Sequence, residues 1–160
     1  MKNHLFFFLL LATIMVTACM APPPTLTDSQ KAAIEKQILE QWGKVSVAVE
    51  KADAEGYTAY LSSKEFLSMS SEGKTFQSSE EYADSVKVWF SARKSVEIQQ
   101  VTTKVNVLTE NLVLLDQKSV FQLNLKDNRI MRFSHAVTFI FKREDAGWKI
   151  IHGHESWISL

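Results

Sequence analysis

The chain of 160 residues contains a single cysteine, Cys19, so an internal disulfide is excluded. Its three prolines are consecutive, at positions 22–24, and it has no glycine-rich loop of the kind that holds phosphate groups. Lysine plus arginine and aspartate plus glutamate number 18 each, so no excess of charge directs the folded part to nucleic acid. We therefore expect no nucleic-acid partner.

Apolar residues are plentiful: 46% of the chain is hydrophobic and 11% is aromatic. Such a composition argues against disorder. A chain of 160 residues is long enough for one domain with a proper core and too short to expect two.

The N-terminus has the pattern of an export signal. Lys2 is followed by the apolar run LFFFLLLATIMV, which has the length of a signal peptide and is short for a membrane span. The run ends in VTAC, which resembles a bacterial lipobox, where signal peptidase cuts before the cysteine and the thiol carries lipid. We predict a lipoprotein signal peptide over residues 1–18. We also predict that Cys19 carries lipid, with palmitate among its acyl groups. The alternative is an ordinary secretory signal with an incidental thiol.

Residues 19–29 contain three consecutive prolines, which favour an extended tether over packed structure. By resemblance to bacterial sorting rules, the absence of aspartate after Cys19 favours the outer membrane of a Gram-negative cell. We therefore expect a lipid-anchored protein of the cell envelope, on the periplasmic side of the outer membrane, with its folded domain at residues 30–160.

The spacing of apolar residues predicts helices in the first half of this domain. A long helix begins near Thr27 or Asp28 and carries an apolar stripe that includes Ile34, Ile38 and Trp42. A short helix follows in EGYTAYL, and another in SSEEYADSVKVWFSAR. Between the two shorter helices, alternation over residues 66–75 indicates a small strand pair or a strand followed by a loop.

Four strand-like runs fill the second half, at about 96–108, 111–125, 129–142 and 148–158, with turns between them. Helices followed by an antiparallel meander define the α+β class.

Alternation along these strands also predicts which face each side chain occupies. If charged residues mark the outer face, His152, His154 and Ser156 of the last strand point inward, and Glu155 points outward. Gln117 and His135, on the two preceding strands, also point inward. Buried imidazoles need hydrogen-bond partners. The group is therefore either a set of core histidines bonded to the backbone or to Ser156 and Gln117, or the lining of a pocket.

A metal site is a weaker hypothesis. Two histidines two positions apart and a third could hold zinc. No cysteine or carboxylate is expected beside them on the inner face, and we predict neither a metal nor a cofactor.

The order of elements, and above all GWKIIHGHES at 147–156, resembles the SnoaL-like branch of the nuclear-transport-factor-2-like superfamily. The ending also resembles the association domain of calcium/calmodulin-dependent kinase. The resemblance implies a cone: a long N-terminal helix and shorter helices packed on a curved, mainly antiparallel sheet, with a pocket at the open end. It places further candidates in the pocket walls, namely Trp42, Tyr57, Tyr60, Phe66 and Trp89.

That superfamily includes ketosteroid isomerases, dehydratases and polyketide cyclases, which use an Asp or Glu base. This chain departs from the pattern, because its inward positions offer His, Ser and Gln. The leading hypothesis is therefore a lipoprotein that binds a small, largely apolar ligand. The alternatives are an isomerase, dehydratase or hydrolase with a histidine base, and a non-catalytic dimerisation module.

The outer face also carries apolar residues, which would need a cover. Members of the superfamily commonly dimerise through the convex face, so the resemblance implies a homodimer. The residues concerned are Leu112, Leu114, Val120, Ile140, Ile151 and Trp157.

Overall fold

The computed structural model describes residues 25–160, except the side chains of residues 100 and 101. The predicted signal peptide, Cys19 and the prolines of the predicted tether lie outside the described residues. The helices are α2 (Asp28–Glu50), α3 (Ala54–Thr58) and α4 (Ser79–Ser91). The strands are β1 (Ser68–Ser71), β2 (Lys74–Phe76), β3 (Arg93–Thr109), β4 (Leu112–Leu125), β5 (Ile130–Glu144) and β6 (Gly147–Ser159).

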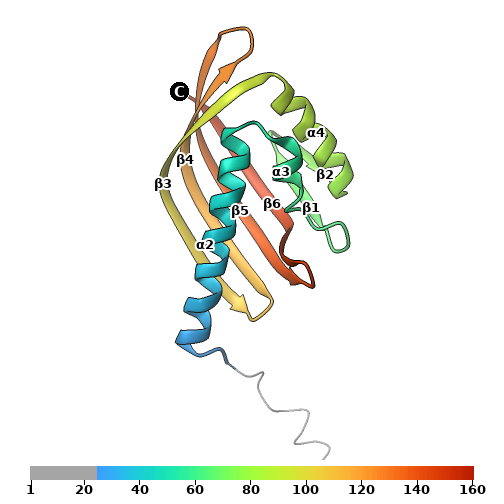
Figure 1. Cartoon of the computed structure of the whole chain (residues 1–160), viewed down its shortest axis with the longest axis vertical. Coiled ribbons are helices and arrows are strands. Elements are labelled where there is room, and N and C mark those ends of the chain that lie inside the picture. The colour runs from blue at the N-terminus through green and yellow to red at the C-terminus, as the bar shows by residue number, and fades with distance from the viewer. Residues whose placement is uncertain (1–24) are drawn as a thin grey trace, which may run out of the picture.

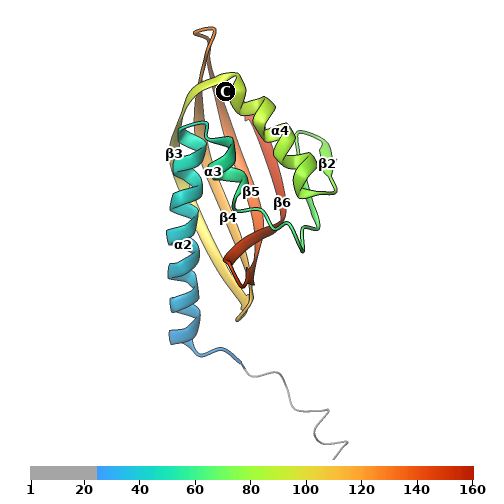
Figure 2. The ribbon, with the colours of Figure 1, turned by 45° about the vertical axis from the view of Figure 1, so that its right-hand side comes forward.

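All six strands form one sheet in the order β2-β1-β6-β5-β4-β3. Only the β1–β6 pair is parallel, and the other pairs are antiparallel. The long strands curve, and the three helices cover one face of the sheet (Figures 1 and 2). The predicted α+β class and the mainly antiparallel sheet are confirmed.

Helix α2 begins as its sequence indicates. Thr27 is the N-cap, and a capping box joins it to Gln30. The predicted stripe is buried against the sheet and includes Ile38 and Val45, which are both fully buried. Within residues 25–160, no helix is long and apolar enough to cross a membrane.

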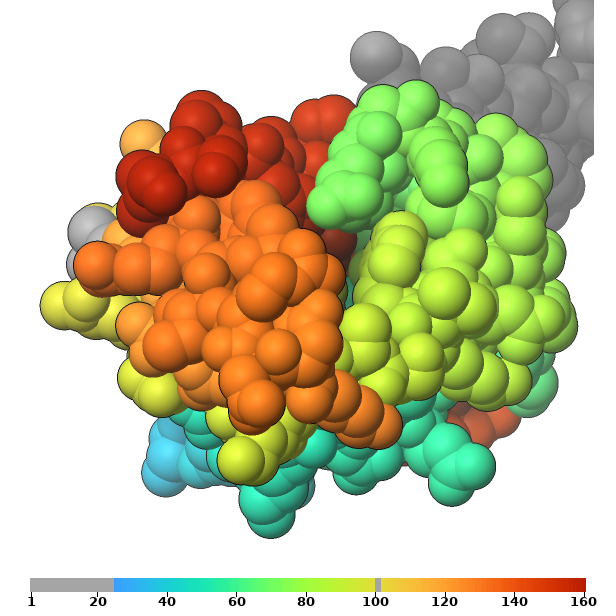
Figure 3. Space-filling view, turned by 90° about the horizontal axis from the view of Figure 1, so that it is seen from above, coloured from blue at the N-terminus to red at the C-terminus, as the bar shows by residue number. Residues whose placement is uncertain are grey.

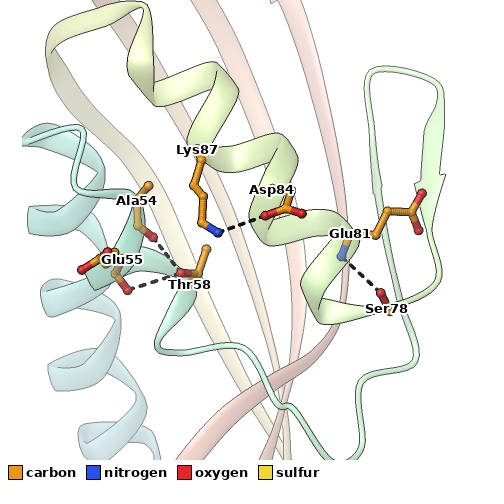
Figure 4. A network of polar contacts seen from close by, with 7 residues as sticks. All are labelled: Ala54, Glu55, Thr58, Ser78, Glu81, Asp84 and Lys87. Atoms are coloured by element: carbon orange, nitrogen blue, oxygen red, sulfur yellow. Dashed lines mark hydrogen bonds and ion pairs between the residues drawn. The ribbon is translucent and has the colours of Figure 1, made fainter.

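The two shorter helices are fixed by local hydrogen bonds (Figure 4). In α3 the Thr58 hydroxyl donates to the carbonyl of Ala54 at 2.8 Å. Ser78 caps α4 by accepting from the backbone N–H of Glu81 at 3.1 Å. Helix α4 packs over the concave face of the curved sheet, where its buried residues Tyr82, Val86 and Phe90 meet the core.

Strands β4 and β5 alternate as predicted. The inward positions of β4 from Val113 to Phe121 are buried, and so are those of β5 from His135 to Phe141. Directly opposite residues share a face, so the pair of Asp116 with Thr138 marks the outer side.

Strand β6 does not keep one alternation along its length. Phe141 pairs with Ile150 and Ile140 pairs with His152, so Ile151 is an extra residue in a β-bulge. Ile150 and Ile151 are both buried as a result. Beyond the bulge the two faces of the strand are exchanged.

The predicted orientation of the end of β6 was therefore wrong. Trp148 and Ile150 point inward as expected, but beyond the bulge the inward residues are odd-numbered, among them Glu155 and Trp157. The residues on the outer side are His152, His154 and Ser156. Trp157 also leaves the set of outer apolar residues, because it lies opposite His135 and lines the concave side. The homodimer stays a prediction.

Candidate functional site

A pocket opens on the concave face, between the C-terminal half of α2, helix α4 and the sheet. It contains about 690 Å³ of empty space, open solvent at its mouth included. Figure 3 looks onto this end of the molecule, where the β1–β2 turn (green), the end of α4 (yellow-green) and the β4–β5 turn (orange) border a hollow. Its lining comprises Trp42, Ser46, Val49, Tyr57, Ser71, Glu72, Tyr82, Val86, Trp89, Phe90, Arg93, Ile98, Gln117, Phe121, His135, Phe139, Glu155 and Trp157.

Glu155 is the carboxyl group of the pocket interior. It is 9% exposed, and Ser71, its register neighbour on β1, donates to Oε2 at 3.0 Å. The Tyr82 hydroxyl donates to Oε1 at 3.4 Å. Burial raises the pKa of Glu155, and these hydrogen bonds offset the shift only in part. The environment therefore favours the protonated carboxyl, which can donate a hydrogen bond or a proton.

Two tyrosines extend this network. The hydroxyls of Tyr57 and Tyr82 are 3.0 Å apart. Burial, and secondly the charge of Glu155, raise the pKa of both phenols. Both hydroxyls stay neutral at ordinary pH and can pass a hydrogen bond from α3 through α4 to the end of β6.

His135 lies across the pocket on β5 and is 4% exposed. Its ring centroid is 4.1 Å from that of Trp157 and 4.7 Å from that of Phe121. Among residues 25–160, neither ring nitrogen has a hydrogen-bond partner. Burial, and then the charge of Arg93, lower the pKa of His135 to about 4. The imidazole is therefore neutral near pH 7, with an unused donor and an unused acceptor.

The floor of the pocket is polar but satisfied. The Trp42 indole N–H and the Thr103 hydroxyl both donate to the Gln117 carbonyl oxygen. The Gln117 amide donates to the Ser119 hydroxyl at 3.1 Å. Gln117 thus holds α2 to the sheet and has little capacity left for a ligand.

Arg93 is the positively charged residue in the lining of the pocket. Arg93 begins β3 directly after α4, and its guanidinium carbon lies 5.0 Å from the centroid of the Phe90 ring. Burial lowers the pKa of Arg93, which still leaves the group charged at neutral pH.

Five of the sequence-derived candidates line this pocket: Trp42, Tyr57, Trp89, Gln117 and His135. Tyr60 and Phe66 pack half-buried against the core and do not line it.

The three candidates at the end of β6 are on the other side of the sheet. The Ser68 hydroxyl lies 3.0 Å from Nδ1 of His152. His154 and Ser156 border a separate depression of the outer face, beside Asp116 and Thr138. Their expected inward position was wrong because the count along the strand did not include the bulge.

The count along β6 also hid the most buried acid of the site, Glu155. The one available signal is the Ile150–Ile151 pair, since two adjacent apolar residues in an otherwise alternating strand can mark a bulge. Arg93 and Ser71 gave no signal, because both lie at the ends of elements that the sequence places only approximately.

A metal site has no support in the geometry of the described part of the chain. No group of three or more His, Cys, Asp or Glu side chains within residues 25–160 could hold a metal ion.

Several solved structures share this cone of helices on a curved sheet. The hexachlorocyclohexane dehydrochlorinase LinA-type3 of Novosphingobium barchaimii LL02 is 16% identical, with a TM-score of 0.67 over 84% of this chain and 94% of that one. The association domain of CaMKII from C. elegans is also 16% identical, with a TM-score of 0.64 over 81% and 99%. A nuclear transport factor 2-like protein of Salmonella enterica is 12% identical, with a TM-score of 0.71 over 79% and 92%.

These likenesses define a protein of the nuclear-transport-factor-2-like fold. Residues 36–159 match the family model of the SnoaL-like domain, and the chain belongs to that family. Among curated protein sequences, none is significantly similar to it.

Proposed function

We propose that this protein is a membrane-anchored periplasmic lipoprotein whose cone-shaped domain binds a small, largely apolar molecule in the concave pocket. The observation that carries the binding proposal is His135, a buried imidazole with two unpaired nitrogens at an aromatic pocket. Buried polar groups without partners are costly, and a bound molecule would supply the partner.

The surrounding residues would divide the work. Phe121, Trp157 and Trp89 supply apolar contact area for the body of the ligand. His135 would exchange a hydrogen bond with a polar group of the ligand, and protonated Glu155 would donate a second one.

Native mass spectrometry of the full-length protein, purified from its own host, tests this proposal. We expect a retained small molecule. The Ser46→Phe variant should lose it, because Ser46 lines the pocket and a phenyl ring would fill the space. Val47→Phe is the matched control, since Val47 is 45% exposed and lies outside the pocket. A wild-type protein without any bound molecule, or retention that Ser46→Phe leaves unchanged, would contradict the proposal.

An enzyme is the second candidate, and the hydrogen-bonded group of Glu155, Tyr82 and Tyr57 favours it. A carboxyl group with a raised pKa is suited to act as a general acid for an isomerase, dehydratase or hydrolase. Of the histidines expected to act as a base, only His135 lines the pocket. Its low pKa makes it a weak base. Turnover of the retained molecule that Glu155→Gln abolishes would support an enzyme over a carrier.

The membrane anchor is a separate proposal. In a Gram-negative host, radiolabelled palmitate should be incorporated into the wild-type chain and not into a Cys19→Ser variant. The variant should also move from the membrane fraction to the soluble periplasm. Labelling that survives the substitution would contradict lipidation at Cys19.

A further inference from the structure

The charge of Arg93 is unmatched in the pocket. Among residues 25–160, no ion pair joins its guanidinium to a carboxylate. The contact with the Phe90 ring covers one side of the group and leaves its five N–H donors unused. The position directly after α4 favours a cation because of the helix dipole, but the α4 carbonyls accept no hydrogen bond from it.

The nearest acids do not neutralise this cation. Among the described residues Glu155 forms no ion pair with Arg93: its carboxyl oxygens accept hydrogen bonds from Ser71 and Tyr82, and burial raises its pKa. Glu72 also lies at the pocket but is exposed on the β1–β2 turn, where solvent screens its charge. Across the pocket, neutral His135 adds no charge. The interior therefore has one positive group and an apolar, aromatic wall.

The kind of anion follows from the number of donors. Arg93 is the only lysine or arginine among the described residues that line the pocket. A phosphate monoester carries nearly two negative charges and is usually held by several donors, whereas one guanidinium matches one carboxylate in a bidentate pair.

We infer that the ligand of this pocket is an apolar monocarboxylate whose carboxylate pairs with Arg93. Its apolar body would lie between the aromatic side chains of α4 and the sheet, with His135 and Glu155 in reach of further polar atoms. This inference rests on the proposed binding function and adds the chemical class of the ligand.

Calorimetric titration of the full-length protein with matched pairs of probes tests it. One pair is 2-naphthoate with 2-naphthamide, and the other is octanoate with octanamide; the members of a pair differ in the charge of one group. The wild type should bind each carboxylate about tenfold or more tightly than its amide, as expected for one charge-assisted pair. Raising the salt concentration should weaken the binding of the carboxylates and leave that of the amides nearly unchanged.

Variants of Arg93 assign the preference to this residue. Arg93→Gln should lower carboxylate affinity to the level of the amide without changing amide binding, and Arg93→Lys should keep part of the preference. Lys94→Gln is the matched control, because Lys94 is the adjacent exposed cation and does not line the pocket. It should behave as the wild type.

The outcomes separate this inference from the proposed function. Equal binding of carboxylate and amide, sensitive to Ser46→Phe, would overturn the role of Arg93 and leave the binding pocket standing. A carboxylate preference that survives Arg93→Gln would do the same. Failure of all four probes to bind would count against both.

Discussion

His135 on β5 and Glu155 on β6 lie diagonally on the concave face: Trp157 is directly opposite His135, and Val137 is directly opposite Glu155. Diagonal neighbours of this kind are about 7–8 Å apart between their Cα atoms. Burial shifts the pKa values of the two residues in opposite directions, down for His135 and up for Glu155. The pocket therefore combines a base and an acid whose neutral forms are both favoured by burial, and the pH dependences that they give to the stability have opposite signs.

For His135, acid should destabilise the fold. The unfolded chain protonates this imidazole below its ordinary pKa near 6.5, whereas the folded chain resists protonation down to about 4. The free energy of unfolding should therefore fall as the pH drops through this window, by a contribution on the order of 3 kcal/mol at most. Urea unfolding of wild type and His135→Phe at pH 7 and pH 4.5 checks this. The variant should lose this dependence, while His154→Gln, on the exposed outer face, should keep it.

For Glu155, the free energy of unfolding should change with pH in the opposite direction. The folded chain holds the proton at pH values where the unfolded chain has released it, so the free energy of unfolding should fall as the pH rises above 4.5. Glu155→Gln removes the titration and keeps one acceptor oxygen, for Ser71 or Tyr82, while its NH2 group replaces the other oxygen and faces a hydroxyl that can rotate to accept. Relative to the wild type, it should gain stability from pH 4.5 to pH 8 in thermal unfolding. Glu35→Gln, on the exposed surface of α2, serves as control; a variant that loses stability over this range would refute the buried acid.

Gly153 should be intolerant of any side chain. It faces inward beyond the β-bulge, and an added Cβ would lie 2.4 Å from the sulfur of Met69 and 2.5 Å from the Phe139 ring. Gly153→Ala should therefore lower stability by about 1–3 kcal/mol through overpacking. Gly43→Ala is the opposite case, because nothing lies within 4 Å of an added Cβ at this position in α2. Gly43→Ala should stabilise the helix by about 0.5–1 kcal/mol.

Differential scanning calorimetry compares the stabilities of Gly153→Ala and Gly43→Ala with that of the wild type. Equal stability of Gly153→Ala and the wild type would contradict the assigned faces of β6.

The bulge should also affect how fast individual histidines react with a chemical reagent. Glu155 and Trp157 face the pocket, whereas His154 faces solvent. Diethylpyrocarbonate should modify His154 readily and His135 slowly at pH 7, as measured by mass spectrometry of peptides. Rapid modification of His135 in the folded protein would show that the pocket does not bury this ring.

Periodicity was enough to predict α2 and the faces of β4 and β5, because each of these follows from one repeating interval. The start of α2 was predicted at Thr27 or Asp28, and the cap is Thr27. The faces at the end of β6 depended on a single inserted residue, Ile151, which shifts the interval without changing the composition. Ile150 and Ile151 are both apolar, and an isolated pair of this kind is compatible with a regular strand that is apolar on both sides.

The hydrogen-bond partners of Glu155 could not be predicted from the sequence, for a different reason. Ser71 and Tyr82 lie on β1 and α4, more than 70 positions earlier in the chain. A carboxylate in a strand is usually on the solvent side. The parallel pairing of β1 with β6 brings the Ser71 hydroxyl beside Glu155, and the packing of α4 on the sheet brings the Tyr82 hydroxyl there. Both contacts are needed to make the burial of Glu155 tolerable.

Helix α2 is 23 residues long, which corresponds to about 34 Å along its axis. The pocket is lined by its C-terminal half, whereas the chain enters at Asp28, at the opposite end (Figure 1). For a chain attached to a bilayer through Cys19, we expect the rigid helix to act as a spacer that carries the opening away from the lipid surface. Such a domain would collect its cargo from the aqueous compartment or from another protein, and not by direct extraction from the membrane to which it is attached.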